Sequence, residues 1–252
     1  MSQKCYFLSD AHLGSLAYDN NRSREQKLCR FLRHAAQDAT DIFLVGDIFD
    51  FWYEYRYVVP KGHVRLLGCL AGLADRGIRL HFFIGNHDIW TYGYLADEIG
   101  MTVYRDAAVM ELGGKRFYIA HGDRTGYRPT RLKLLHAFFH SSWIRRIYNT
   151  IHPWFNFTLG YNWSRYNRKH KHRQEEAVFL GEDREYLVQF AKNYKEQPID
   201  YFVFGHRHVM LDLMLTQGRR VVYLGDWIDK FSYGVFDENG FRLEIFEADE
   251  AE

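Results

Sequence analysis

Five short apolar runs in this chain each end in a cluster of side chains that can bind metal ions. The clusters are Asp10-Ala11-His12, Gly46-Asp47, Gly85-Asn86-His87-Asp88, His121-Gly122-Asp123 and Gly205-His206-Arg207-His208. Together they offer carboxylate, amide and imidazole groups, the mixed donor set that Mn²⁺, iron and Zn²⁺ accept. One such cluster occurs by chance in many chains of this length. Five in series, each directly after a strand-like run, predict a two-metal hydrolytic centre.

The runs also predict the sheet that gathers these ligands. They are short, apolar on both faces and rich in β-branched or aromatic side chains, as in strands buried between layers, and they span residues 5–8, 42–45, 80–84, 117–119 and 201–204. Amphipathic patterns predict helices at 22–36 and 64–76. Alternating strands and helices imply right-handed crossovers and a mainly parallel sheet. Because loops at the carboxyl ends of such strands converge, we expect Asp10, Asp47 and Asn86 to meet.

The pattern changes after residue 204. Four closely spaced runs predict strands at residues 210–215, 220–224, 233–236 and 241–246. Asn239-Gly240 supplies a turn that hairpins favour, so we expect these strands to form a second, antiparallel sheet. A length of 252 residues suits one α/β domain with an insertion, and a single domain over residues 1–252 is predicted.

The net charge of +1 hides a division along the chain. From Arg124 to Gln174, 51 residues include 11 Lys or Arg, 11 aromatic residues, five His and no Asp or Glu. The rest of the chain holds 22 basic and 32 acidic residues. These numbers predict a cationic, aromatic insertion on an acidic body, which we assign to residues 124–190. Apolar spacing predicts helices in it at 131–143 and 175–193, and Pro153 is expected to break a helix.

Basic residues without acids attract an anionic partner, which is a nucleic acid, an anionic lipid surface or a charged metabolite. The insertion also carries six aromatic residues that either suit a membrane interface or fill its own small core, namely Trp143, Trp154, Phe155, Phe157, Tyr161 and Trp163. The chain begins without a basic segment followed by an apolar one. Its three cysteines show no Cys-x-x-Cys spacing. We expect a cytoplasmic protein, peripheral on the cytoplasmic face of the inner membrane.

The ligand clusters resemble those of the calcineurin-like metallophosphoesterase superfamily, whose Asp-x-His, Gly-Asp, Gly-Asn-His-Asp/Glu, His and Gly-His-x-His motifs occur here in order. The resemblance covers about residues 4–208 apart from the insertion. It implies a four-layer α/β/β/α sandwich with a helical lid. It also implies two divalent cations, with Mn²⁺ as the expected metal and Asp47 as the bridging carboxylate. One cation is assigned to Asp47, Asp10, His12 and His208, and the other to Asp47, Asn86, His121 and His206.

His87 has no place among these ligands and is predicted to be catalytic together with Asp88. Such a pair can donate a proton to a leaving oxygen, or bind a phosphoryl oxygen as an imidazolium, and the superfamily uses this histidine in that way. Arg124 and Arg207 could neutralise phosphate charge. Asp226 is interpreted as a structural residue at a strand end.

Within the superfamily, the chain is similar to the UDP-2,3-diacylglucosamine hydrolases of lipid A biosynthesis. The similarity lies in residues 9–14, residues 46–52, the helical insertion after His121-Gly122-Asp123, and Leu224-Gly225-Asp226-Trp227. It implies hydrolysis of a pyrophosphate to UMP and 2,3-diacylglucosamine 1-phosphate, with the lid contacting acyl chains and the nucleotide sugar. The best-known members carry Arg at the position of His87. The residues expected to contact substrate are Arg124, Tyr127, Arg165, Arg168, Lys169 and Arg207.

Two other functions agree with the same residues. A phosphodiesterase or nuclease of the superfamily could track a nucleic acid with the basic insertion and stack bases on its aromatic rings, although nucleic acid is not the expected partner. A non-catalytic scaffold of this fold could bind a membrane or a protein partner. The scaffold hypothesis predicts that ligands are missing, whereas the sequence contains all of them.

Overall fold

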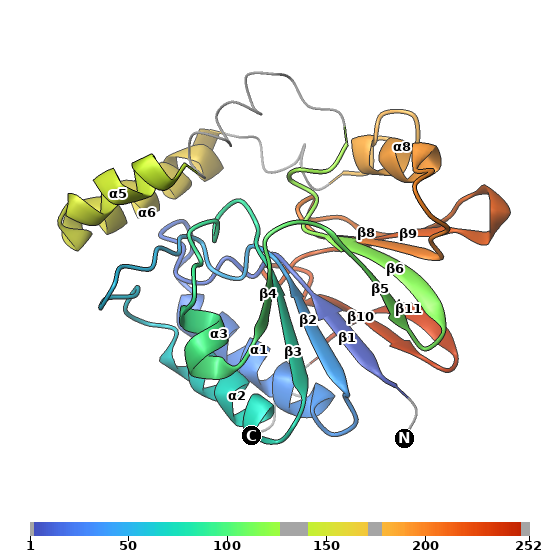
Figure 1. The fold of residues 1–252 in the computed structure, drawn as a ribbon, viewed down its shortest axis with the longest axis horizontal. Helices are drawn as coiled ribbons and strands as arrows, with labels where there is room; N and C mark the ends of the chain where they lie inside the picture. Colours follow the sequence, from blue (N-terminus) through green and yellow to red (C-terminus); the bar gives the residue numbers. More distant parts are fainter. Residues whose placement is uncertain (1–2, 127–140, 171–177, 248–252) are drawn as a thin grey trace.

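The computed structural model describes residues 3–126, 141–170 and 178–247, and in this part of the chain two β-sheets pack between helices (Figure 1). The first sheet forms mainly from the first half of the chain. In chain order its elements are β1 (Cys5–Leu8), α1 (Asn21–Ala35), β2 (Asp41–Val45), α2 (Val64–Asp75), β3 (Arg79–Phe83), α3 (Tyr94–Ile99) and β4 (Thr102–Tyr104). Neighbouring strands from β1 to β4 pair in parallel. This confirms the predicted parallel sheet and its two long helices, while α3 and β4 are too short for a sequence pattern to predict.

The second sheet has the order β5-β6-β7-β9-β8, with β5 (Ala108–Leu112), β6 (Lys115–Ala120), β7 (Tyr201–Phe204), β8 (Met210–Met214) and β9 (Arg220–Leu224). A 3₁₀ turn, η1 (Thr216–Gly218), joins β8 to β9. The last strands, β10 (Ser232–Asp237) and β11 (Gly240–Ile245), instead extend the first sheet, whose order is β11-β10-β1-β2-β3-β4.

The prediction that the last four strands form one antiparallel sheet is therefore wrong. Two of them join each sheet, and β9 runs parallel to β7. The reason is that alternation of side chains predicts a strand but does not specify the strand it pairs with. The hairpin predicted at Asn239-Gly240 is confirmed, because β10 and β11 pair antiparallel across it.

Central strands bury side chains on both faces, which explains their lack of polar alternation. In β1, Tyr6 and Leu8 pack against the helix layer, whereas Cys5 and Phe7 pack between the two sheets. On the outer face of the second sheet, Phe202 lies in the cluster that includes helix α8 (Tyr186–Asn193). The layers are helix, sheet, sheet and helix, as predicted for a four-layer sandwich.

The described part of the insertion contains α5 (Ser142–Thr150) and α6 (Pro153–His170). We call residues 141–170 the α5–α6 unit. Pro153 is the first residue of α6 and separates it from α5, as expected. The helix predicted at 131–143 lies almost entirely outside the described residues. Among the described residues from 178 onward, the helix predicted at 175–193 begins at Tyr186, because Gly181 adopts a left-handed backbone (φ 90°) that a helix does not tolerate.

All three cysteines are free thiols that pack in apolar layers: Cys5 and Cys29 are buried and Cys69 is half-buried. In the described ranges, no helix combines the length and the apolar composition that crossing a bilayer requires.

Candidate metal centre

The predicted ligands come together where the carboxyl ends of strands from both sheets meet. Loops after β1, β2 and β3 of the first sheet, and after β6 and β7 of the second, carry them. Potential ligand atoms lie within 4.8 Å of one another in three groups, which are Asp10 with His12 and His208, His12 with Asp47 and His87, and Asp47 with His121 and His206. The convergence expected for these remote segments is thus observed.

Asp47 lies at the centre of these groups. Its Oδ2 atom is 3.3 Å from Nε2 of His121 and 3.7 Å from Nε2 of His12, so it faces one ligand of each predicted cation. Its Oδ1 atom accepts a hydrogen bond of 2.8 Å from the backbone N–H of His87. Asp10 Oδ1 approaches the same His12 Nε2 atom to 3.6 Å. This geometry leaves Asp47 Oδ2 as the oxygen that could bridge two cations.

Several potential ligand atoms are buried and lack a hydrogen-bond partner among the described residues. They are Asp10 Oδ1, His12 Nε2, Asn86 Oδ1 and His121 Nε2. Leaving a buried polar atom unpaired costs about 1–3 kcal/mol, so four of them at one place indicate that a ligand completes their bonding. Carboxylate, amide and imidazole atoms together suit a divalent transition-metal ion. The residues therefore fit the two cations predicted for them.

The backbone is strained at the same place. Seven non-glycine residues in the described part of the chain have a left-handed φ, and five of them are predicted ligands, with φ between 42° and 67°: Asp10, His12, Asp47, His206 and His208. Each such residue costs about 1–3 kcal/mol and persists only where the surroundings hold it. The other two such residues, His63 and Phe231, are not predicted ligands. The concentration of this strain in the ligand loops indicates that the fold is built to aim these side chains.

Electrostatics favour ionised carboxylates and an uncharged His206 at the centre, whereas the charges of Asp47 and Asp10 raise the pKa of His121 well above its ordinary value despite its burial. Burial alone would raise the pKa of Asp47, but the neighbouring His121 lowers it well below its ordinary value. Burial also opposes ionisation of Asp10, yet the charge of His208 lowers its pKa to about 2. Burial and the charge of His121 lower the pKa of His206 to about 3. At neutral pH both carboxylates are ionised and His206 is uncharged, as metal ligands must be.

Hydrogen bonds from outside the ligand set orient it. Nδ1 of His121 donates to the carbonyl oxygen of Val45 at 2.9 Å, which leaves Nε2 to face the centre. Asp10 Oδ2 accepts from Ser9 Oγ at 2.6 Å and from the backbone N–H of His206 at 2.8 Å. Since Asp10 follows a strand of the first sheet and His206 one of the second, this carboxylate joins the two halves of the site.

The predicted pair of His87 and Asp88 is not a hydrogen-bonded pair. Asp88 is fully buried, and its two oxygens accept backbone N–H groups of Gly85 at 2.6 Å and Ile48 at 2.9 Å. The ring of His87 bonds instead to the backbone oxygen of Asp50, at 2.8 Å from Nδ1. Asp88 is better described as a positioning residue that holds two ligand-bearing loops together. Burial, with the charge of nearby Asp47, raises its pKa to about 7.

Two acids that contact ligand histidines were not identified as site residues from the sequence. Asp50 Oδ1 lies 3.6 Å from Nδ1 of His12, and Asp226 Oδ2 lies 3.8 Å from Nδ1 of His208. Asp226 also caps a turn, as expected for a strand end, because its Oδ1 accepts three backbone N–H groups. No spacing rule could have paired these acids with those histidines, since only the folded loops bring them together.

The described residues among those expected to contact substrate lie on separate elements. Arg207 donates to Glu185 through Nε and Nη2 of its guanidinium group. Arg124 lies 3.3 Å from Asp106. Arg165 is exposed on α6. Arg168 and Lys169 lie in the last turn of that helix, and Tyr127 lies outside the described residues.

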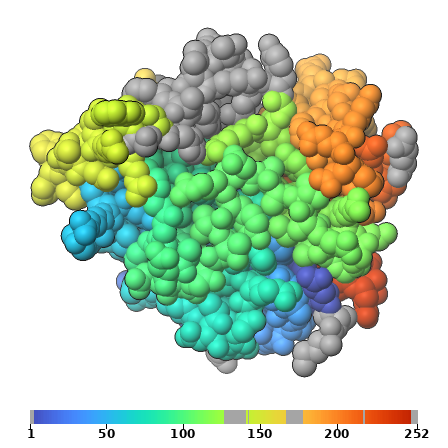
Figure 2. All heavy atoms as spheres, viewed as in Figure 1, coloured from blue at the N-terminus to red at the C-terminus, as the bar shows by residue number. Residues whose placement is uncertain are grey.

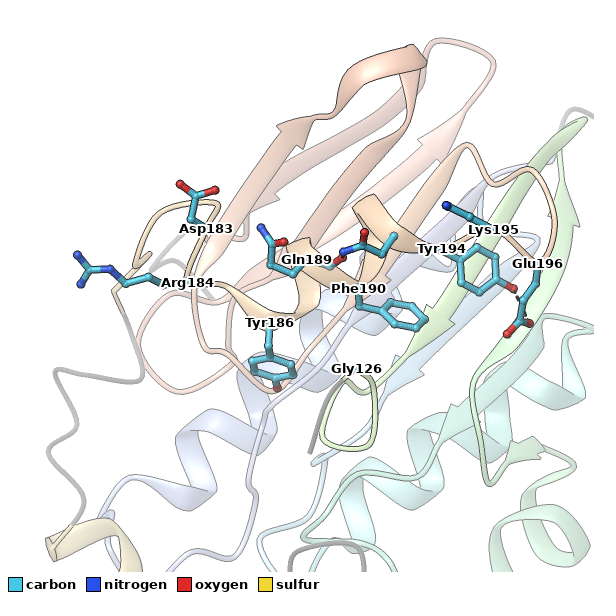
Figure 3. A pocket seen from close by; sticks show the side chains of 10 residues that line it. Gly126, Asp183, Arg184, Tyr186, Gln189, Phe190, Tyr194, Lys195 and Glu196 are labelled. Carbon is cyan, nitrogen blue, oxygen red and sulfur yellow. Dashed lines mark hydrogen bonds between the residues drawn. The ribbon is translucent and has the colours of Figure 1, made fainter. Parts of the chain in front are cut away.

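Two cavities lie near the metal centre and helix α8. The smaller, about 220 Å³, adjoins the metal centre and is lined by His121, Asp123 and Arg124 among others. The larger, about 910 Å³, lies along α8, and Figure 3 shows Tyr186 and Phe190 of that helix facing the loop at Gly126. None of the described residues that line the larger cavity is a predicted metal ligand.

The glycines that precede three ligand residues are required by close approach. A Cβ on Gly46 would lie 2.5 Å from His121 Nδ1, one on Gly85 would overlap Asp47, and one on Gly205 would lie 2.8 Å from Asp10 Oδ2. Such distances are shorter than real Cβ contacts, so these positions exclude larger residues.

Replacing Gly205 by alanine is expected to lower the free energy of unfolding by about 1–3 kcal/mol, because the added methyl group displaces Ser9 and Asp10. Urea denaturation measures this change, and Mn²⁺ titration is expected to show weaker binding. The matched control is Gly68→Ala in α2, where a Cβ meets nothing within 4 Å. The free energy of unfolding of that control is expected to rise by about 0.5–1 kcal/mol. Equal effects of the two substitutions would contradict the steric argument.

The chain belongs to the calcineurin-like phosphoesterase family, whose profile matches residues 4–210. It is 37% identical to a UDP-2,3-diacylglucosamine hydrolase of Porphyromonas gingivalis over 260 residues, which cover 98% of this chain and 99% of that protein. It is 25% identical to the hydrolase of the same name from Vibrio vulnificus strain YJ016, over 94% of this chain and 96% of that one. Both resemblances that the motifs indicated are thereby confirmed.

Proposed function

We propose that this protein hydrolyses the pyrophosphate of UDP-2,3-diacylglucosamine, consuming one water and releasing UMP and 2,3-diacylglucosamine 1-phosphate. The observation that carries the proposal is the set of buried, unpaired ligand atoms around Asp47 Oδ2. It occurs in a chain that matches a UDP-2,3-diacylglucosamine hydrolase over nearly its whole length. The two features together give the reaction type and the substrate.

Two divalent cations, with Mn²⁺ as the expected metal, would be held by the two ligand sets that share Asp47. When bound, such ions neutralise phosphate charge and acidify a water molecule so that it can act as the nucleophile. The fold of the chain positions the side chains that would bind these ions. Asp10 and Asp47 present their carboxylates from the first sheet, and His206 and His208 present their rings from the second.

His87 is placed to assist the departing group. A carbonyl oxygen only accepts hydrogen bonds, so Nδ1 of His87 must carry the proton that it donates to the backbone oxygen of Asp50. The second ring nitrogen, Nε2, is therefore the one available to a substrate. The side chain is about one-quarter exposed, at 24%, so a substrate can reach it. As an imidazolium it would bind a phosphoryl oxygen or give a proton to the leaving oxygen.

The α5–α6 unit is proposed to hold the acyl chains. Its inner side packs on the loop after Asp47, where Phe51 contacts Phe157 and Tyr161 at ring distances of 6.0 and 5.7 Å. A Cβ on Gly14, two residues after His12, would lie 3.7 Å from the ring of Tyr161. This unit therefore lies against two loops that carry metal ligands, and a lipid bound beneath it would have its head group at the centre.

The direct test is to incubate the protein with UDP-2,3-diacylglucosamine and Mn²⁺ and to measure the release of UMP. We expect release that stops with a chelator and returns with Mn²⁺. The control is UDP-N-acetylglucosamine, which has the same pyrophosphate but carries only an acetyl group on the sugar nitrogen and no acyl group on the 3-oxygen. It is expected to react far more slowly. Fast turnover of another phosphoester without UMP release would refute the substrate assignment, and salt-sensitive cleavage of single-stranded DNA would favour the nuclease alternative.

We further propose that the α5–α6 unit binds an anionic membrane surface. Four of the six aromatic residues singled out from the sequence are exposed, while Phe157 and Tyr161 pack on the body. On α6 an apolar stripe at helical spacing faces solvent, with exposed fractions of 55–67%, and consists of Phe155, Leu159, Trp163 and Tyr166. Figure 2 shows the unit as a projecting lobe at one end of the molecule. Exposed apolar stripes of this kind mark contact surfaces.

Replacing Phe155, Leu159 and Trp163 together by serine is expected to weaken binding to phosphatidylglycerol vesicles at least about tenfold. Inserting three such side chains contributes more than the roughly 1.4 kcal/mol that a tenfold change requires. Vesicle co-sedimentation measures the change. The control Met214→Ser removes an exposed apolar side chain on β8 and is expected to bind like the parent chain. Equal loss in the control would argue against a specific membrane face.

A further inference from the structure

A largely buried ion pair joins the end of the insertion to a metal-ligand loop. Nη2 and Nε of Arg207 donate to the two carboxylate oxygens of Glu185 at 2.9 and 3.1 Å. The side chains are only 12% and 1% exposed. Glu185 also accepts a hydrogen bond from the backbone N–H of Leu180 at 3.2 Å and one from the hydroxyl of Tyr223 at 3.4 Å. The carboxylate is thus held in one orientation from four directions.

The position of Arg207 gives this pair its significance. Arg207 lies between His206 and His208, predicted ligands of different cations, and both histidines have a left-handed backbone, with φ of 67° and 50°. Glu185 immediately precedes α8 and follows a segment of turns near the end of the insertion. The ion pair therefore connects a strained ligand loop to an element outside the sheet that carries it.

Strain of this kind requires contacts that prevent relaxation. On the side of the first sheet, the loop is held by the hydrogen bond from the backbone N–H of His206 to Asp10 Oδ2, at 2.8 Å. The hydrogen bonds of the Arg207 side chain go to Glu185 and to the carbonyl oxygen of Val178. Without Glu185 the guanidinium group would be a buried charge without its carboxylate, and the loop would move to bring it to solvent.

We propose that Glu185 is a positioning residue of the metal centre, acting through Arg207 to hold His206 and His208 in the orientation that binds the two cations. The inference rests on the metal-binding part of the proposed function and adds a residue to it. It also means that the end of the insertion and the metal centre are coupled, so that a change at either one alters the other.

The test is Mn²⁺ affinity of Glu185→Gln by isothermal titration, at a temperature where circular dichroism shows every variant to be folded. Residues that orient metal ligands typically contribute about 10- to 100-fold in affinity, and a loss in that range is expected. The matched control is Glu182→Gln in the same segment. Glu182 pairs with Lys192 at 2.7 Å but is 46% exposed and touches no ligand loop. Its Mn²⁺ affinity is expected to equal that of the parent chain.

A second variant separates positioning from stability. Replacing both partners, Glu185→Leu with Arg207→Met, removes the pair without leaving a buried charge, so the free energy of unfolding should stay near that of the parent. Weak Mn²⁺ binding by this double variant would support the positioning role of Glu185. The double variant alone provides this test if Glu185→Gln does not fold. If either variant binds Mn²⁺ as tightly as the parent chain, the inference about Glu185 is wrong, while the proposed function still stands. If the parent chain itself binds no Mn²⁺, the proposed function fails, and the inference fails with it.

Discussion

Asp47→Asn is expected to reduce kcat for UDP-2,3-diacylglucosamine by at least about 10³-fold. Loss of one preorganised electrostatic contact at a reaction centre typically costs about 10²- to 10³-fold, and the Asp47 carboxylate is proposed to serve two cations at once. The amide keeps an oxygen for the hydrogen bond from the backbone N–H of His87, so the loop is expected to stay folded. Steady-state kinetics and elemental analysis measure the rate and the bound Mn²⁺, which should fall below two per chain.

The control for this substitution is Asp75→Asn, at the exposed end of α2, which is expected to change neither quantity. An Asp47→Asn protein that retains two Mn²⁺ ions and full activity would remove the basis for a bridged pair. Unchanged hydrolysis together with lost partner binding would instead support the non-catalytic scaffold.

His87→Ala is expected to lower kcat by about 10²- to 10⁴-fold, the usual contribution of a positioned acid or base. Bound Mn²⁺ should remain at two per chain, because His87 is assigned to catalysis although it lies in one group of potential ligand atoms with His12 and Asp47. Kinetics and metal analysis of the same sample measure both values. Loss of one Mn²⁺ would show that His87 is a ligand. His34→Ala, on the exposed side of α1, is the control.

The variant His87→Arg distinguishes the two roles of this side chain. Arginine keeps the positive charge but does not release a proton near neutral pH. Activity close to that of the parent chain would therefore indicate that His87 binds a phosphoryl oxygen. Activity as low as that of His87→Ala would indicate that it donates a proton.

Much of the fold follows from local pattern. Runs such as β1 and β7 are apolar on both faces because they lie between two layers, and the helical periods of α1 and α2 match the face that packs on the first sheet. The pairing of the last strands does not follow from local pattern, because backbone hydrogen bonds to either sheet satisfy the same residues equally well. The start of α8 was missed for a different reason: Gly181 interrupts an otherwise helical apolar spacing.

The candidate site divides in the same way. Its metal-binding atoms belong to side chains of distinctive chemistry placed directly after strands, so Asp10, Asp47 and His121 could be assigned from residue type and order. Their supporting contacts could not be assigned. Asp50 and Glu185 are ordinary acids in sequence, and each gains a role only because folding places it against His12 or Arg207.

Residue type and order alone determined that the chain is a mainly parallel α/β protein with a dinuclear hydrolytic ligand set and a basic, aromatic insertion. The tertiary structure decided which sheet each late strand joins, which side of α6 faces solvent, and that Arg207 pairs with Glu185. The physical reason is the distance along the chain over which each kind of interaction acts. Strand and helix patterns, and the kinds of atom a residue offers, are properties of neighbouring residues, whereas ion pairs, strained loops and exposed faces depend on contacts between segments far apart in the chain.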